Sequence, residues 1–141
     1  MLVFAATLGA CGWHLGSPPA ARWSLDHLAA PVSEPVVSDA LLRALRHAGV
    51  GEQGGAPITV RVAQADWRPS GALDGGTGWK ATLAVEVVAA GQTTRLQASR
   101  RVAPAATSGE AAEARAAAFA SLATTLAPDV AAWLDTVSAS P

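Results

Sequence analysis

The chain has little of several residue types, and each shortage excludes a class of protein. Its 141 residues contain no Tyr and a single Cys, so no disulfide can form within the chain. The net charge is −1, so the chain lacks the excess of positive charge that a general nucleic-acid binder needs. No uninterrupted apolar run reaches the roughly 18 residues of a membrane-spanning helix. With 50% hydrophobic residues, the composition is that of a folded domain and not of a disordered chain.

The N-terminal segment has the character of a secretion signal. Residues Met1 to Ala10 are apolar and uncharged, although the basic residues that usually begin such a signal are missing. The segment ends in Leu8-Gly9-Ala10 directly before Cys11, and a large apolar residue, two small residues and Cys resemble the lipobox of a bacterial lipoprotein. We expect residues 1–10 to be a lipoprotein signal peptide. Cys11 would then carry covalent lipid chains that anchor the protein in a membrane, with no other cofactor. Alternatively, Cys11 is a small buried apolar residue.

The rest of the chain divides into a tether and one domain. Residues 11–22 are rich in Gly, Ser and Pro and are predicted to form a lipidated tether, and residues 23–138 a single α+β domain. Strands are expected where apolar and polar residues alternate, and helices where apolar residues recur every three or four positions. The pattern predicts strands over 23–28, 58–67, 79–88 and 93–103, and helices over 35–48 and 107–137.

This order of elements, β-α-β-β-β-α, indicates an α+β fold. Two amphipathic helices can cover one face of a sheet and leave the other face in water. We therefore predict a two-layer sandwich, in which two helices pack on one face of a mainly antiparallel four-stranded sheet. Pro128 falls inside the second predicted helix, and we expect a kink or break near Ala127 because Pro cannot donate the helical hydrogen bond.

The sequence contains no constellation typical of catalysis or metal binding. His14, His27 and His47 lie far apart and lack the spacing of metal ligands. There is no glycine-rich phosphate loop followed by a Walker-type Lys. An acylated Cys11 could not act as a nucleophile. We therefore predict that the protein is not an enzyme and holds no metal.

Charge is unevenly distributed along the chain. Eight basic and four acidic residues lie between Arg43 and Arg101, whereas four acidic residues and one Arg follow from Glu110 onward. Strand alternation places four basic residues on the face opposite the apolar one: Arg61, Lys80, Arg95 and Arg101. They are candidates for binding phosphates or other anionic groups, or they are ordinary solubilising charges on a wet sheet face. Alternation also points Arg100 inward, unless a bulge redirects it or it lies at the rim of the sheet.

Four of the five tryptophans fall into two pairs. Trp79 and Trp133 fall on apolar faces of predicted elements and are expected in the core. Trp13 and Trp23 lie near the predicted anchor, so they either pack on the domain or rest at the membrane interface.

The run Cys11-Gly12-Trp13-His14-Leu15 resembles the start of mature proteins of the LptE family, the lipopolysaccharide-assembly lipoproteins. The predicted order of elements agrees with that family, which packs two helices on a four-stranded sheet. The resemblance implies a lipoprotein anchored at the periplasmic face of the outer membrane. It also implies that the protein plugs a β-barrel partner, LptD, and assists lipopolysaccharide transport by binding lipopolysaccharide. The basic residues that would do so are Arg61, Lys80 and Arg95.

Two other functions remain open at this point. An auxiliary lipoprotein of an envelope ABC transporter or of a secretion complex can share the same α+β sandwich. An envelope enzyme is a weaker alternative, because the sequence offers no paired nucleophile and base.

Overall fold

A computed structural model describes residues 23–30, 35–51, 54–70, 78–104 and 107–139. The predicted signal peptide, the tether and Cys11 lie outside these described residues. The elements follow the predicted order, with β1 (Trp23–Ala29), α2 (Pro35–His47), β2 (Ala56–Ser70), β3 (Gly78–Ala89), β4 (Gln92–Val102) and α3 (Ser108–Ala139).

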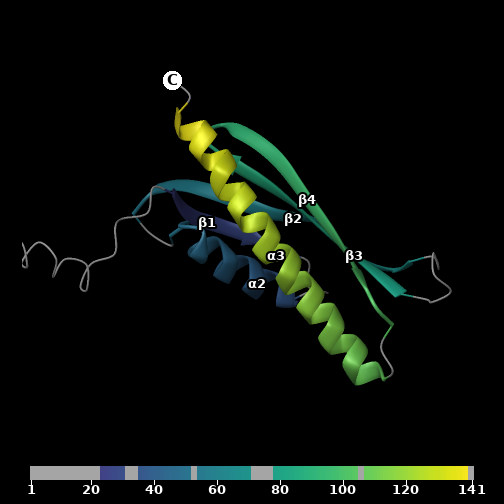
Figure 1. The fold of residues 1–141 in the computed structure, drawn as a ribbon. Coiled ribbons are helices and arrows are strands. Elements are labelled where there is room, and N and C mark those ends of the chain that lie inside the picture. Colours follow the sequence, from purple (N-terminus) through teal and green to yellow (C-terminus); the bar gives the residue numbers. More distant parts are fainter. Residues whose placement is uncertain (1–22, 31–34, 52–53, 71–77, 105–106, 140–141) are drawn as a thin grey trace, which may run out of the picture.

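The four strands form one mixed sheet in the order β1-β2-β3-β4. The β1–β2 pair is parallel, because α2 carries the chain back across the sheet between them. The β2–β3 and β3–β4 pairs are antiparallel. Both helices lie on the same face of the sheet, and α3 crosses it diagonally (Figure 1). The predicted fold class, a two-layer α+β sandwich, is therefore confirmed.

The hydrophobic core lies between the helices and the sheet. The apolar residues that recur every three or four positions along α2 are buried, with Val37, Leu41 and Leu45 almost inaccessible to solvent. The central strand β3 contributes Leu83, Val85 and others from its helix-facing side. The face of α3 that meets them consists of Phe119, Leu122, Ala123, Leu126, Ala127, Val130, Leu134 and Val137. Burial of these side chains drives the docking of both helices.

We expected a kink or a break near Ala127, and there is no break, because α3 continues from Ser108 to Ala139 with Pro128 inside it. Pro128 removes one main-chain hydrogen bond, but Leu126, Ala127 and Val130 around it are buried against the domain. Packing on both sides of the proline therefore holds the helix in one piece.

By length and composition alone, α3 is long and apolar enough to cross a membrane. This was not predicted from the sequence, because no uninterrupted apolar run in the chain is long enough. In the fold, 44% of its most apolar window is buried against the rest of the domain. We therefore interpret α3 as the core helix of the sandwich.

A β-bulge divides β2 into two parts. Even-numbered residues point toward the helices before the bulge and away from them after it. The register with β3 shifts between Val62 and Gln64, so Ala63 is an extra residue. Strict alternation from Val62 would have turned Gln64 and Asp66 toward the helices. After the bulge, Ala65 and Trp67 pack against the core instead. The strand also continues to Ser70, three residues beyond its predicted end at position 67.

The tryptophans in the described part of the chain all contact the domain. Trp23 is buried at the start of β1. Of its two predicted locations, the domain and the membrane interface, the structure shows the domain. Trp133 is partly buried against the core, as predicted. Trp79 was also expected in the core, but it is only partly buried at the start of β3 and is not among the core residues. Its ring stacks on Trp67 with centroids 5.3 Å apart. The Arg115 guanidinium lies 6.0 Å from the Trp67 ring and ties this end of the sheet to α3.

Candidate functional site

The face of the sheet that the helices leave uncovered is polar along β2, β3 and β4. The strand register aligns its side chains in rows that cross the three strands. From Glu86 to Lys80 along β3, these rows are Arg61–Glu86–Arg95, Gln64–Ala84–Gln97, Asp66–Thr82–Ser99 and Arg68–Lys80–Arg101. We call the surface made by these twelve residues the open face. It carries five cations and two anions, so it is positively charged in a protein of nearly neutral net charge.

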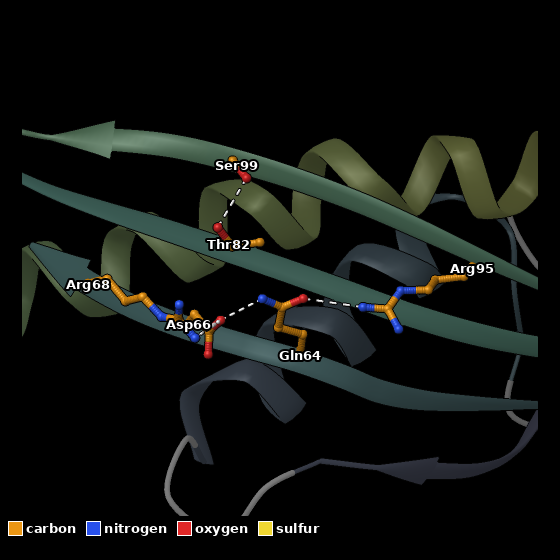
Figure 2. A network of polar contacts seen from close by, with 6 residues as sticks. All are labelled: Gln64, Asp66, Arg68, Thr82, Arg95 and Ser99. Carbon is orange, nitrogen blue, oxygen red and sulfur yellow. Dashed lines mark hydrogen bonds and ion pairs between the residues drawn. The ribbon is translucent and has the colours of Figure 1, made fainter. Parts of the chain in front are cut away.

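The first row contains two of the predicted cations with an acid between them. The Arg61 Nη2 atom lies 3.0 Å from a Glu86 carboxylate oxygen, with the two side chains 56% and 31% exposed. Arg95 is the neighbour of Glu86 on β4, and its guanidinium donates to Gln64 Oε1 at 3.2 Å (Figure 2). Both arginines therefore have partners within the protein, and Glu86 neutralises part of their charge.

The last row has the larger unbalanced positive charge. Lys80 lies directly opposite Arg68 on one side and Arg101 on the other. Arg68 lies 3.2 Å from a carboxylate oxygen of Asp66, and its side chain remains 75% exposed. Lys80 and Arg101 are exposed, and neither forms an ion pair with another described residue. Three cations and one carboxylate thus share a small area of water-facing surface, which favours an anionic ligand.

A shallow polar hollow of about 230 Å³ lies beside this row. Its lining consists of Gln64, Asp66, Arg68, Lys80, Thr82, Gln97 and Ser99. The Gln64 amide donates to the Asp66 carboxylate, and the Thr82 and Ser99 hydroxyls share a hydrogen bond of 3.1 Å (Figure 2). Amides and hydroxyls both donate and accept, so this lining can bind ligand hydroxyls next to a group of cations.

The structure brings the four predicted cations together as two pairs and not as one patch. Arg61 and Arg95 flank Glu86, whereas Lys80 and Arg101 face each other six positions further along β3. At the rise of an extended strand, the two rows are about 20 Å apart.

Sequence reasoning missed Arg68, because the predicted strand ends at position 67, one residue before it. The strand continues through Pro69, so Arg68 joins the row of Lys80 and Arg101. The polar residues Gln64 and Asp66 were missed because the bulge at Ala63, which turns them onto the open face, has no mark in the sequence.

Arg100 lies at the rim of the sheet, which is one of its two predicted placements. The β3–β4 register has no bulge, and Arg100 pairs with Ala81 on the helix-facing side. Its side chain is exposed and donates to the Ser121 hydroxyl of α3 at 2.6 Å. Arg100 therefore connects the sheet edge to the helix and is not part of the open face.

Among the residues that the structure describes, no group of three or more His, Cys, Asp or Glu side chains is placed to hold a metal ion. His14 and Cys11 lie outside those residues.

No protein-family model matches this chain, and no curated protein matches it in sequence. Solved structures, however, have a similar fold. A minor lipoprotein from Acinetobacter baumannii is 17% identical with a TM-score of 0.52, over 80% of this chain and 90% of that one. A proposed lipoprotein from Caulobacter crescentus is 16% identical with a TM-score of 0.54, over 83% and 93%. PelC from Paraburkholderia phytofirmans, a dodecamer, is 16% identical with a TM-score of 0.50, over 79% and 90%. At these identities the likeness shows a shared fold.

Proposed function

We propose that this protein is a non-catalytic lipoprotein, anchored through Cys11 at the periplasmic face of the outer membrane. Its open face would bind lipopolysaccharide during assembly, and its partner would be the β-barrel protein LptD, as the resemblance to LptE implies. The lipobox-like run before Cys11 supports the anchor. The similar fold of lipoproteins from Acinetobacter baumannii and Caulobacter crescentus is consistent with it.

The observation that carries the binding proposal is the row Arg68–Lys80–Arg101 beside the polar hollow. A phosphorylated sugar presents phosphate oxygens and hydroxyls on one rigid frame. Guanidinium and ammonium groups form charge-assisted hydrogen bonds to the phosphates. Thr82, Ser99 and Gln97 line the hollow and would bind the neighbouring hydroxyls.

A double substitution tests this proposal. Lys80→Ala with Arg101→Ala removes two cations from the open face, and Arg43→Ala with Arg46→Ala removes the same charge from α2. Binding to purified lipopolysaccharide is measured by co-sedimentation at low and moderate salt. We expect at least a tenfold loss for the first variant only, with a weaker salt dependence than that of the wild type. Equal binding by the two variants would remove the open face from the proposal.

The anchor is tested separately by mass spectrometry of the protein purified from membranes. We expect a chain that begins at Cys11 and carries acyl groups, and a Cys11→Ala variant that is released into the soluble fraction. An unmodified thiol in a chain that still carries residues 1–10 would contradict the lipoprotein proposal.

A second candidate is an auxiliary lipoprotein of an envelope ABC transporter or of a secretion complex. The fold that this chain shares with PelC, which forms a dodecamer, favours a role within a larger assembly. Affinity purification after crosslinking separates the two candidates. Recovery of a large β-barrel supports the LptD partnership, whereas recovery of an inner-membrane or secretion complex without a barrel supports the second candidate.

A further inference from the structure

The outer edge of β4 has no partner strand among the described residues. β4 is the last strand of the sheet, and it pairs with β3 along its whole length of 11 residues without a bulge. None of its residues is buried, and even the helix-facing Leu96, Ala98 and Val102 are only partly covered. The free N–H and C=O groups of such an edge are a template for pairing with another strand.

Several features that commonly block edge pairing are absent from β4, since the strand contains no Pro, no Lys and no bulge. Its charges are three arginines, Arg95 and Arg101 on the open face and Arg100 on the helix side. Like charges that lie directly opposite each other on paired strands are destabilising. The positions of these arginines therefore determine which strand, and which register, fits this edge.

The β4 sequence is complementary to itself in one antiparallel register. With Gln97 on a two-fold axis, all 11 residues find a partner, and each arginine faces a hydroxyl side chain. The pairs are Gln92 with Val102, Thr93 with Arg101, Thr94 with Arg100, Arg95 with Ser99, and Leu96 with Ala98. Sliding the copies by two residues shortens the pairing to nine residues in either direction, and in one direction it also places Arg95 opposite Arg101.

We propose that β4 pairs with β4 of a second copy of this chain, antiparallel and centred on Gln97. The pairing joins the two sheets into one, with all helices on the same face, and packs Leu96 of each copy against Ala98 of the other. An interface of this kind uses the same surface twice, as a two-fold dimer requires. The proposal is independent of the ligand, because it rests on the edge and not on the hollow.

Crosslinking at chosen positions of β4 tests both the pairing and its register, in a Cys11→Ser background that removes the natural thiol. Gln97→Cys is expected to give a disulfide-linked dimer under mild oxidation. Thr93→Cys and Arg101→Cys are each expected to remain monomeric on oxidation. In this register, each position lies about 25 Å from the same position in the second copy. A mixture of these two variants is expected to form the linked dimer, since the positions face each other.

Charge substitutions test the uncrosslinked dimer by analytical ultracentrifugation of the purified protein. Thr93→Glu places a carboxylate opposite Arg101 in both copies, and Thr93→Arg places a cation there. We expect dimerisation to be roughly two- to thirty-fold tighter for the first variant and weaker by a similar factor for the second.

Three results would overturn the proposal. They are a monomer at every concentration, equal crosslinking at positions 93, 97 and 101, or crosslinks from Gln97→Cys in cells that reach a different protein and never a second copy.

Discussion

The Arg61 guanidinium and the Glu86 carboxylate lie 3.0 Å apart on neighbouring strands. Glu86 also lies opposite Arg95 of β4, so this one carboxylate lies between both cations of its row. Because the pair is exposed, it contributes less than about 1 kcal/mol to stability. Its larger effect is on the electrostatic potential of the open face.

We expect Glu86→Gln to strengthen binding of anionic ligands, because the change removes one negative charge and frees the Arg61 guanidinium. Co-sedimentation with lipopolysaccharide should show several-fold tighter binding with a steeper salt dependence. Glu113→Gln removes the same charge from the exposed side of α3 and serves as the control. Tighter binding by both variants alike would indicate an effect of net charge and not of the open face.

Deletion of Ala63 tests the bulge that builds the open face. Without the extra residue, the part of β2 that follows must turn over, which moves Gln64 and Asp66 toward the core and exposes Trp67. We expect a loss of more than about 3 kcal/mol in unfolding free energy, because polar groups would be buried without partners. Urea unfolding measures it. Ala63→Ser keeps the residue count and should stay within about 1 kcal/mol of the wild type, so equal losses would show that the bulge is not required.

The regular parts of this fold were predictable because each depends on local periodicity. The stripe of Val37, Leu41 and Leu45 and the alternation in β3 determine which side of each element is apolar, and the structure confirms both. Four of the five cations of the open face followed from the same alternation, since each lies opposite the apolar side of its strand: Arg61, Lys80, Arg95 and Arg101.

The remaining features depend on contacts between distant residues. The bulge at Ala63 contains no Gly, and it is fixed by the pairing of Gln64 with Ala84 on β3. Arg68 precedes Pro69 in a stretch typical of a loop, yet pairing with Lys80 extends the strand through it. The cations fall into two rows because their partners on β3, Glu86 and Lys80, lie six positions apart. These partners are known only once the strand register is known.

Trp23 combines burial with an unsatisfied polar group. The residue is 9% exposed, and the indole nitrogen has no hydrogen-bond partner in the described structure. We expect Trp23→Phe to change the unfolding free energy by no more than about 1 kcal/mol, because the lost packing is offset by removal of an unpaired N–H group. Trp23→Ala should cost about 3–5 kcal/mol. Urea unfolding distinguishes the two, and a Phe variant as unstable as the Ala variant would show that the indole nitrogen is satisfied in solution.

Pro128 gives the last prediction, since an exposed proline within a continuous helix lowers stability without contributing to the core. Its ring removes the hydrogen bond to the Thr124 carbonyl and crowds that oxygen. One turn earlier, the hydroxyls of Thr124 and Thr125 each donate to a main-chain carbonyl, those of Ala120 and Ser121, at 3.0 Å. Such bonds accompany helix bending, so this segment of α3 departs from ideal helical bonding on its solvent side.

We therefore expect Pro128→Ala to restore the missing hydrogen bond and to raise the unfolding free energy by about 1–3 kcal/mol. Urea unfolding followed by circular dichroism measures both stability and helix content. Asp129→Ala changes the neighbouring exposed position and should remain within about 0.5 kcal/mol of the wild type. A Pro128→Ala variant that is no more stable than the Asp129→Ala control would show that α3 has already adapted to the proline, so that no helical hydrogen bond is gained by removing it.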